Sequence, residues 1–432
     1  MKVLVYGSGG REHALTWKLA QSSVIDDIFI WPPSPVMGRF AKQLDLHSEA
    51  SHKEVLEAAV RQRVDFVVVG PEGPLASGFA DVAKEVGLPC FGPVMAAAKL
   101  ESSKAFAKAV MKEAGIPTAA YTTVSSREEC LQVAQSMLSQ SGGVVLKASG
   151  LAGGKGVFVC TSEADLLAGV ERLYDSNMRV AAEEVVLEEV LVGRECSFFT
   201  FVGQGDPAAV GFAVDFKRLS DGDKGPNTGG MGCYTPVPWL PKNAADLVMS
   251  RIVEPLLSVL KSRGVHYSGC LYVGLMWDSE GPKVVEFNVR LGDPEAQVLA
   301  VQDDRDWGAL ISGSLGLVDS NDNSPLTTSK SSVCVVMASK GYPYSSMQDV
   351  KPTFSESLFV PGSDSCATFA AAVGEENGQL FAGSGRVLTV AANGGDFAEA
   401  RRKVYTQVAE LAELWPGVQY RRDIAKKVTD EG

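Results

Sequence analysis

The stretch VVEFNVRLGDPEAQ (residues 284–297) places a carboxylate and an amide two residues apart. Val284, Glu286 and Asn288 alternate along a predicted strand, so Glu286 and Asn288 are expected on one face, which Arg290 continues. Carboxylate and amide oxygens are hard ligands, suited to Mg²⁺ that bridges phosphate oxygens rather than to zinc. Since Glu, Asn and Arg on one face of a buried strand would be costly as plain core, the pattern predicts a metal–phosphate site.

A glycine-rich segment lies between two predicted strands at 144–149 and 156–160. KASGLAGGKGV (147–157) combines two lysines, Lys147 and Lys155, with unhindered backbone amides at Gly153 and Gly154. It is not a Walker loop, because the GxxxxGK[ST] pattern and a following helix are both missing. The segment predicts a β-hairpin folded over the phosphates of a nucleotide; a glycine-rich hairpin with a surface lysine is the alternative.

Three acidic residues follow in LEEVLVGRE (187–195). Glu188, Glu189 and Glu195 lie where a strand meets a connection. Carboxylate and backbone acceptors there could bind an adenine amino group and a ribose diol, although acidic pairs often form only a solvated face.

The N-terminal stretch GSGGREH (7–13) places backbone amides at the start of a predicted helix, where the helix dipole attracts anions. Glu12 stands where a dinucleotide fingerprint has its third glycine, and no acidic residue follows the second strand. The pattern therefore disfavours NAD and favours another anion site to which Arg11 could add a cation; a simple tight turn is the alternative.

DGDKGPNTGGMG (221–232) holds five glycines and has neither a helical nor a strand period. It is expected to be a loop whose backbone approaches a charged ligand, with a surface linker as the alternative.

The composition excludes several classes of protein. A net charge of −12 argues against a nucleic-acid or anionic-membrane surface. Eight scattered cysteines without a CxxC pair, and four histidines, fit neither a structural zinc site nor a secreted disulfide framework. No apolar run approaches the roughly 18 residues of a membrane span, and the mature fold is expected to start at Met1. We expect a soluble cytoplasmic protein with reduced thiols.

Short apolar runs alternate with helical patterns in the first third of the chain, which predicts a doubly wound parallel sheet. Its strands are expected at 2–7, 27–31 and 64–70, and its helices at 11–22, 52–63, 75–87 and about 102–114. Further strands are expected at 185–192, 195–203, 208–216, 270–278 and 283–288, with helices at about 162–173, 243–263, 294–304 and 396–413. A break at GIPT (115–118) and a polar linker at 319–332 help divide the chain into 1–117, 118–191, 192–326 and 327–432.

In this order, the motifs resemble those of the ATP-grasp enzymes, and specifically the phosphoribosylamine–glycine ligase family. The resemblance runs nearly end to end. Besides the segments quoted above, it rests on DFVVVGPEGPLASG (65–78), DFKRLSDGDKGPNTGGMGCYTPVP (215–238), YSGCLYVGLM (267–276), SGRVLTV (384–390) and YRRDIA (420–425). It implies an α/β ATP-grasp architecture: an N-terminal Rossmann-like domain, a small lid, a central α+β domain and a small C-terminal α+β domain.

The resemblance also implies an activity and a set of site residues. ATP would phosphorylate the carboxylate of glycine, and 5-phosphoribosylamine would displace the phosphate to give glycinamide ribonucleotide in purine synthesis. Lys104 and Lys147 would contact the phosphates beneath the 150–156 loop, and Glu188, Glu189, Val190 and Glu195 would hold adenosine. Glu286 and Asn288 would bind Mg²⁺ or Mn²⁺, with Arg290 facing the transferred phosphate. The remaining residues would bind or shape the acceptor and acid sites: Gly9, Gly10, Arg11, Glu12, Glu72, Asp215, Lys217, Asp223, Asn227, Gly229, Gly230 and Asp293.

The chain departs from the family pattern at four places. This chain has Pro32-Pro33-Ser34 where the family pattern has PGN, and Phe216 where it has the histidine of DHKR. It has Ala370-Ala371-Ala372-Val373 at the position of HAGT, and Arg194 in place of a glutamate. The changes lie in elements expected near the acceptor amine. Two alternatives therefore stay open: an ATP-grasp ligase of a specialised pathway that joins a different amine or amino acid, and a nucleotide-binding regulatory protein without turnover. As an enzyme on small molecules, the protein is expected to be a monomer or homodimer.

Overall fold

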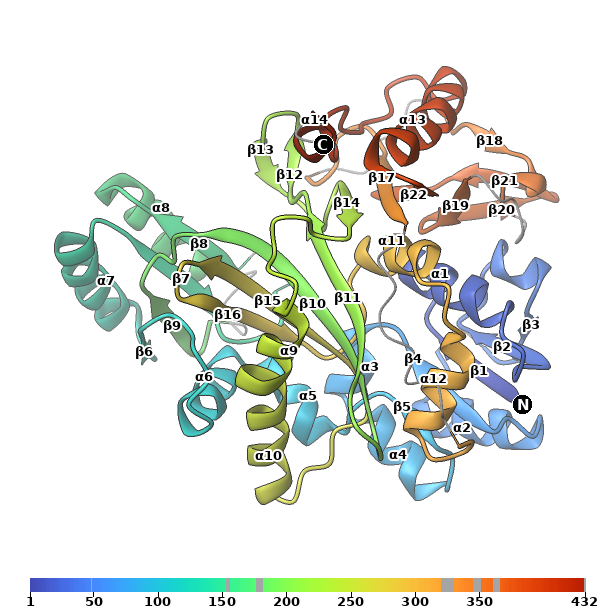
Figure 1. The fold of residues 1–432 in the computed structure, drawn as a ribbon, viewed down its shortest axis with the longest axis horizontal. Helices are drawn as coiled ribbons and strands as arrows, with labels where there is room; N and C mark the ends of the chain where they lie inside the picture. Colours follow the sequence, from blue (N-terminus) through green and yellow to red (C-terminus); the bar gives the residue numbers. More distant parts are fainter. Residues whose placement is uncertain are drawn as a thin grey trace.

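The computed structural model describes residues 1–47, 49–152, 156–175, 182–319, 330–344, 351–359 and 366–430. Its N-terminal part is a five-stranded parallel sheet in the order β3-β2-β1-β4-β5 (Figure 1). The strands are β1 (Lys2–Tyr6), β2 (Asp27–Trp31), β3 (Lys42–Gln43), β4 (Phe66–Val69) and β5 (Cys90–Phe91). Both clusters of buried apolar side chains that flank this sheet extend into the central part of the chain. The predicted doubly wound parallel sheet is confirmed.

Helices accompany this sheet in alternation with its strands. They are α1 (Gly10–Leu19), η1 (Met37–Arg39), α2 (His52–Arg61), α3 (Glu72–Ala76), α4 (Phe79–Glu85), α5 (Met95–Ser102) and α6 (Lys104–Glu113). The helix expected over 75–87 is two helices, because the chain turns at Gly78, whose φ of +88° lies in the left-handed region. The helix expected at 102–114 begins at Lys104, with Ser103 as its N-cap.

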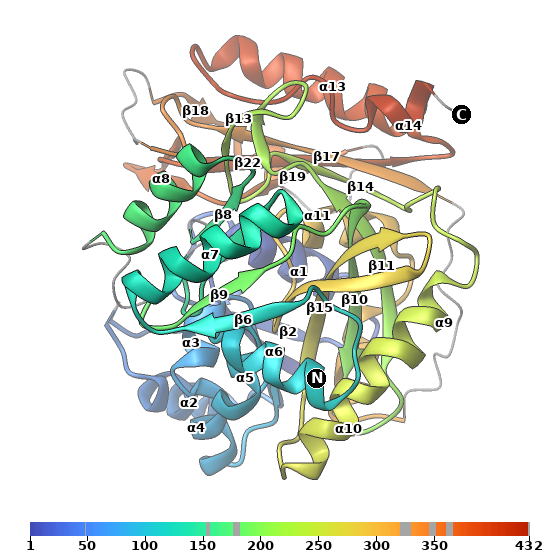
Figure 2. The same ribbon diagram turned by 90° about the vertical axis from the view of Figure 1, so that its left-hand side faces the viewer.

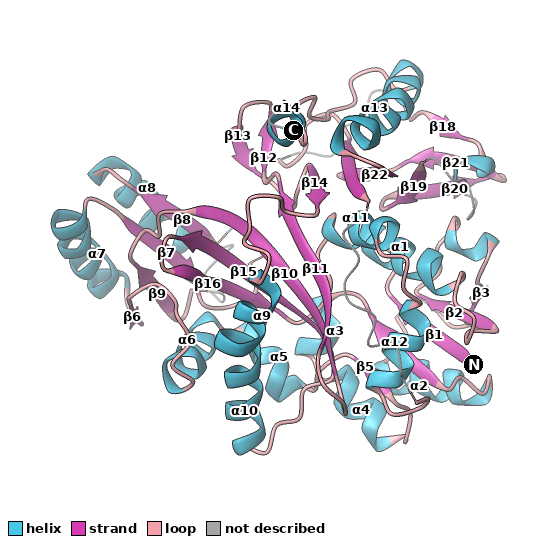
Figure 3. Cartoon of the chain, viewed as in Figure 1, coloured by secondary structure: helices cyan, strands magenta, loops and turns pink. Residues whose placement is uncertain are grey.

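An eight-stranded antiparallel sheet forms the centre and continues into the C-terminal part (Figure 3). Its order is β16-β15-β10-β11-β14-β17-β22-β19. The strands are β10 (Arg194–Val202), β11 (Ala208–Asp215), β14 (Gly232–Thr235), β15 (Gly269–Asp278), β16 (Gly281–Asn288), β17 (Ser331–Ala338), β19 (Ala367–Ala370) and β22 (Arg386–Gly394). The sheet thus runs across the domain boundary predicted at 326.

Helices of the central and C-terminal parts cover this sheet. They are α9 (Ala244–Val248), the π-helical η2 (Met249–Val253), α10 (Glu254–Ser262), α11 (Glu295–Gln302), α12 (Trp307–Ser314), η3 (Glu356–Phe359), α13 (Phe397–Leu414) and α14 (Lys426–Asp430). A small sheet in the order β18-β21-β20 completes the C-terminal part, from β18 (Thr353–Phe354), β20 (Val373–Glu376) and β21 (Gln379–Ala382).

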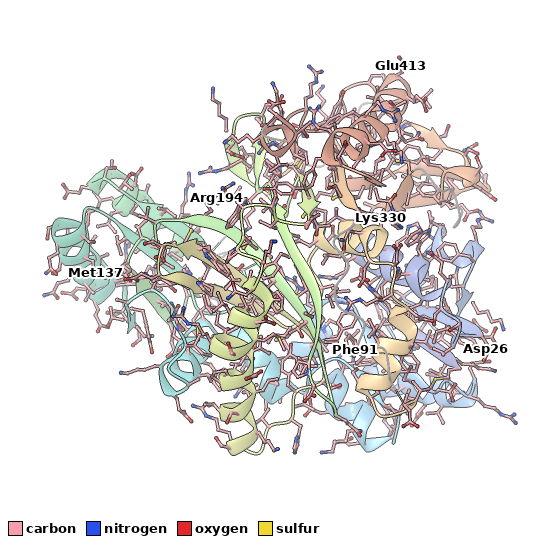
Figure 4. All side chains as sticks on the ribbon, in the orientation of Figure 1. Asp26, Phe91, Met137, Arg194, Lys330 and Glu413 are labelled. Carbon is pink, nitrogen blue, oxygen red and sulfur yellow. The ribbon has the colours of Figure 1, made fainter. Side chains whose placement is uncertain are left out.

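A separate lobe carries a four-stranded antiparallel sheet in the order β6-β9-β7-β8 (Figure 2). It consists of β6 (Tyr121–Val124), α7 (Arg127–Ser141), β7 (Val144–Ala148), β8 (Val157–Cys160), α8 (Glu163–Leu173) and β9 (Val185–Glu188). Strands β7 and β8 pair antiparallel from Val144↔Cys160 to Lys147↔Val157, which confirms the predicted hairpin around the glycine-rich segment. In Figure 4, Met137 marks this lobe, Glu413 marks α13, and Arg194 lies between them.

The segment 221–232 is not the featureless loop that its composition predicts. Strand β13 (Lys224–Asn227) pairs with β12 (Arg218–Ser220) in a hairpin, whose tip includes Asp223 at a φ of +55°. Glycine and proline weaken strand propensity, but a two-stranded hairpin docked on another segment forms without an alternating pattern. Among the described residues, no helix is long and apolar enough to cross a membrane.

Candidate active site

Glu286 and Asn288 lie on β16 beside a β-bulge. Gly274 pairs with Glu286 and Leu275 pairs with Val284, so Val285 is the extra residue. The bulge interrupts the alternation: Val284 packs in the same hydrophobic cluster as Phe287 and Val289. The expectation that Val284 alternates regularly with Glu286 and Asn288 is therefore wrong, while the shared face of Glu286 and Asn288 follows from the regular strand after the bulge.

Positive side chains surround Glu286. Burial raises the pKa of this carboxyl, but the charges of Lys217, Lys147 and Lys104 outweigh burial and hold the pKa below its ordinary value. No group of three or more His, Cys, Asp or Glu side chains that could hold a metal occurs in the described part of the chain. A divalent ion at Glu286 and Asn288 would therefore need its remaining oxygens from phosphate and water, which fits the habit of Mg²⁺.

Arg290 joins this strand to the N-terminal domain. Its Nη2 donates to Asn288 Oδ1 at 3.3 Å and lies 2.8 Å from Glu101 Oε1, while its Nε donates to Glu72 Oε2 at 3.3 Å. Glu101 Oε2 also accepts the Val289 N–H at 2.8 Å. Sequence analysis did not single out Glu101, because a glutamate near the end of the predominantly apolar helix α5 gives no sign in sequence that it is buried.

Glu188 lies between two lysines. Its Oε2 is 2.8 Å from Lys147 Nζ and its Oε1 is 3.2 Å from Lys108 Nζ. All three side chains are at most 5% exposed. Lys147 Nζ also donates to the carbonyl of Val285 in the bulge at 3.0 Å. The structure thus brings together the predicted Lys147 and Glu188 and adds Lys108, which sequence analysis missed because a lysine one helical turn after Lys104 looks like solvated surface.

The other predicted adenosine ligands follow Glu188. The backbone N–H of Glu189 donates to Ala120 O at 3.0 Å, and its side chain accepts the Ala120 N–H at 3.0 Å. Val190 packs against Gly143. Glu195 forms an ion pair with Lys217. Gly153, Gly154 and Lys155 of the predicted phosphate loop lie outside the described residues.

The N-terminal glycine loop reaches the same site through Arg11. Its Nη1 donates to Leu291 O at 3.0 Å, and its Nη2 lies 3.9 Å from Glu72 Oε2. Glu12 is 3% exposed and fully engaged locally, since it accepts the Gly9 N–H at 2.7 Å and Arg11 Nε at 2.6 Å. Glu12 therefore shapes the loop, as in a capping box. A pocket beneath these groups is lined by Arg11, Gly70, Phe91, Cys270, Arg290 and Leu291, among others.

Asp293 connects the glycine loop with the 221–232 segment. A Cβ on Gly10 would lie 2.8 Å from Gln297 Nε2 and 3.4 Å from Asp293 Oδ2, so Gly10 packs closely there. Arg386 Nη1 donates to Asp293 O at 2.6 Å and to the carbonyls of Gly229 and Gly230.

Asp215 lies beneath Gly230. A Cβ on Gly230 would stand 2.7 Å from Asp215 Oδ1, and that oxygen accepts no hydrogen bond from the described part of the chain. Burial and the nearby Glu295 raise the pKa of Asp215 well above its ordinary value. Gly10, Asp215, Gly229, Gly230 and Asp293 therefore meet at one place.

Asp223 and Asn227 lie elsewhere on the hairpin. Asp223 Oδ1 accepts Arg421 Nη1 at 2.7 Å, and Asn227 pairs with Arg218 across β12 and β13. Within the described ranges, no hydrogen bond or ion pair joins either residue directly to Arg290. The structure gives Asp223 an anchoring contact with the C-terminal segment.

The departures from the family pattern have clear contacts. The Phe216 ring lies 4.8 Å from the Arg421 guanidinium, and that of Trp239 lies 4.4 Å from the Arg194 guanidinium. Ser34 Oγ accepts the Met37 N–H at 3.3 Å, at the start of η1. Ala370, which stands for the histidine of HAGT, donates its N–H to His13 Nδ1 of α1 at 2.8 Å, next to the N-terminal glycine loop.

Solved structures define the class of this fold. Biotin carboxylase from Campylobacter jejuni, in a β-γ-ATP complex, superposes with a TM-score of 0.71 at 16% identity, covering 97% of this chain and 92% of that one. A phosphoribosylamine–glycine ligase from Thermotoga maritima superposes with a TM-score of 0.78 at 31% identity, covering 98% and 100%. The fold is that of the ATP-grasp enzymes, which use ATP and a divalent metal.

Family comparisons are more specific. Models of phosphoribosylglycinamide synthetase match in three parts: the N domain at 1–101, the ATP-grasp (A) domain at 102–296 and the C domain at 332–427. The phosphoribosylamine–glycine ligase of Agrobacterium fabrum is 39% identical over 431 residues, 98% of each chain. That of Streptococcus pneumoniae is 38% identical over 432 residues, 99% of each. The chain belongs to the phosphoribosylamine–glycine ligase family.

Proposed function

We propose that this protein is an ATP-dependent carbon–nitrogen ligase that joins glycine to 5-phosphoribosylamine and forms glycinamide ribonucleotide, ADP and phosphate. The observation that carries the proposal is the position of Arg290. This guanidinium contacts Asn288 of the metal face and Glu72 of the N-terminal domain, so it lies where a phosphate donor and an acceptor amine would meet.

ATP binding would use the groups around Lys147. Lys104 and Lys147 would contact the phosphates, with Gly153, Gly154 and Lys155 above them. Glu188, Glu189, Val190 and Glu195 would hold adenosine; in support, Glu188 Oε1 lies 3.2 Å from Lys108 Nζ but accepts no well-aligned hydrogen bond among the described residues, so it can also accept an adenine amino group. Glu286 and Asn288 would hold Mg²⁺ or Mn²⁺, which supplies charge neutralisation on the phosphates when bound.

The acid and the amine would bind on the other side of Arg290. Gly9, Gly10, Arg11, Glu12 and Glu72 would form the site for the sugar-phosphate amine, with Glu12 acting through the loop it orders. Asp215, Lys217, Gly229, Gly230 and Asp293 would surround glycine, and Asp223 and Asn227 would hold the hairpin that carries Gly229 and Gly230. The glycine carboxylate attacks the terminal phosphorus of ATP and ADP leaves; the amine nitrogen then attacks the acyl carbon, releasing phosphate and a proton.

Catalysis of this kind needs no side-chain nucleophile. Positioning of the reactants and stabilisation of the negative charge that shifts between phosphate and acyl oxygens are sufficient. Arg290 supplies fixed positive charge for that purpose. Lys147 and Lys104 add to it, because their charges act on the same Glu286 carboxylate as that of Arg290.

The test is ADP release by the purified chain with Mg²⁺, ATP, glycine and freshly formed phosphoribosylamine, with the amide product identified by mass spectrometry. ADP release is expected only when all components are present. Turnover with another acid–amine pair, and none with glycine and phosphoribosylamine, would overturn the substrate assignment.

One observation favours a second candidate, a ligase of a specialised pathway with a different amine or amino acid. Ala370, which stands where the family pattern has the histidine of HAGT, donates its N–H to His13 of α1 at 2.8 Å, one residue after the proposed amine-site residue Glu12. The same assay with alternative amines in place of phosphoribosylamine discriminates the two. In either case we place the protein in the cytoplasm, as a monomer or homodimer.

A further inference from the structure

Lys108 belongs to a closed ring of buried polar contacts that contains Lys147. From Lys108 Nζ, a hydrogen bond of 2.8 Å runs to Thr118 Oγ1, and Thr118 Oγ1 donates to Val284 O at 2.6 Å. The neighbouring carbonyl, Val285 O, accepts Lys147 Nζ, and Glu188 then bridges Lys147 back to Lys108. The ring therefore connects α6, the 116–119 segment, the β16 bulge and strands β7 and β9 of the lobe.

The charges in this ring do not balance. Two lysines share one glutamate, and all three side chains are at most 5% exposed. With Lys108 protonated, the group carries one net positive charge. Without Lys108, Glu188 would neutralise Lys147 alone, and the group would carry none. Since charges interact strongly in a partly desolvated site, this difference acts directly on any polyphosphate that approaches Lys147.

We propose that Lys108 is a positioning residue for ATP binding: it offsets the charge of Glu188, so that the charge of Lys147 stays available to the phosphates of a nucleoside triphosphate. This inference rests on the proposed function, because it takes the ligand of Lys147 to be ATP. Lys108 acts through Glu188 and Thr118, without touching the nucleotide.

Other groups around Lys108 are compatible with this role. Its Nζ lies 5.4 Å from the Tyr121 ring centroid on β6, which stabilises a cation. Burial lowers the pKa of Lys108 to about 8, and the charge of Lys147 also lowers it. The charges of Glu188 and, more weakly, Glu189 act in the opposite direction and raise this pKa. Lys108 is thus mostly protonated at neutral pH, and its proton is lost in the mildly alkaline range.

The experiment measures the Kd of Mg·ATP by titration calorimetry, without the other substrates. The variants are Lys108→Met, Glu188→Gln, the double variant, and Lys112→Met as a control one turn further along the exposed side of α6. Lys108→Met is expected to raise Kd about tenfold or more, and Lys112→Met to change it less than about twofold. In the Glu188→Gln background, where no carboxylate is left to neutralise Lys147, the Lys108 replacement is expected to change Kd less than about twofold.

If Lys108 served packing alone, its replacement would weaken ATP binding equally in the wild-type and the Glu188→Gln protein. That result would overturn the inference. So would a Kd of Lys108→Met within about twofold of the control. As a second readout, wild-type affinity should fall as the pH rises through about 8, and this fall should be smaller in Lys108→Met. If Lys108→Met does not fold, Thr118→Val, which removes the closer hydrogen-bond partner of Lys108 and leaves only the Ala119 carbonyl at 3.5 Å among the backbone partners, must raise Kd at least about threefold, or the inference is wrong.

These outcomes separate the inference from the function on which it rests. If the wild-type protein binds no ATP, or releases no ADP with any acid–amine pair, the proposed function fails. If the wild type passes both tests and Lys108→Met behaves like the control, only the role of Lys108 fails.

Discussion

Glu101 and Arg290 form a buried ion pair in which Glu101 Oε1 lies 2.8 Å from Arg290 Nη2. The two side chains are 7% and 16% exposed. Because the second oxygen of Glu101 accepts the Val289 N–H, the pair fixes the guanidinium relative to the end of β16. The residue proposed to act on the transferred phosphate is therefore oriented by helix α5 of the N-terminal domain.

Replacing Glu101 by Gln should disturb both stability and turnover. The amide keeps an acceptor for Val289 N–H but leaves Arg290 without its nearest countercharge, and losing one partner of a buried pair costs about 3 kcal/mol or more. We expect the free energy of unfolding to fall by about that amount in urea titrations, and kcat to fall about tenfold or more. Glu113→Gln, which removes the exposed partner of Arg263, is the matched control and should change neither. Unchanged kcat in Glu101→Gln would show that Arg290 does not need this orientation.

The metal face can be tested at Glu286. Glu286→Ala should lower Mg²⁺-dependent ADP release about a hundredfold or more, since it removes the only carboxylate of the proposed pair. In a Mg²⁺ titration of the activity, the variant should need a higher Mg²⁺ concentration for half-maximal ADP release. Glu280→Ala, in the exposed turn between β15 and β16, serves as control. Full activity of Glu286→Ala would remove the metal assignment.

Asp223 offers a test between anchoring and direct catalysis. Its contact with Arg421, a side chain that is 0% exposed, predicts that Asp223→Ala loosens the hairpin and lowers the free energy of unfolding by about 1 kcal/mol. We expect this loss to shrink in an Arg421→Met background, because the two replacements remove the same contact. Limited proteolysis at 218–227 reports the loosening. A large fall in kcat with no change in stability or proteolysis would instead support a direct catalytic role for Asp223.

His13 should make stability depend on pH. Its Nδ1 accepts the Ala370 N–H at 2.8 Å, and complete burial lowers the pKa of the imidazole to about 3. The unfolded chain, with a pKa near 6.5, binds the proton more readily, so stability is full above about 6.5 and is lost as the pH falls toward 3. Between pH 7 and 5 this group alone should remove about 2 kcal/mol.

His13→Asn is the informative variant, because its amide oxygen can still accept from Ala370 but does not take up a proton. Its loss of stability between pH 7 and 5 should be smaller than that of the wild type. His47→Asn, at a side chain that is 64% exposed, should retain the wild-type dependence. Equal slopes in wild type and His13→Asn would contradict the assignment.

Three features could be predicted from the amino-acid sequence: the parallel N-terminal sheet, the β7–β8 hairpin and the shared face of Glu286 and Asn288. Each of these follows from local rules: apolar runs with helical spacing between them, glycines between strands, and the period of two along a strand. Family resemblance added the ATP-grasp architecture, which the comparisons with solved structures and relatives support.

Which charged side chains meet could not be predicted from the sequence, because their contacts form only in the folded protein. The Glu101–Arg290 pair, the position of Lys108 beside Glu188, and the contact of Asp223 with Arg421 each depend on segments far apart in the chain. A lysine or glutamate looks the same in sequence whether it is solvated or buried against a partner. Burial and pairing, which set its free energy, exist only after the domains have packed together.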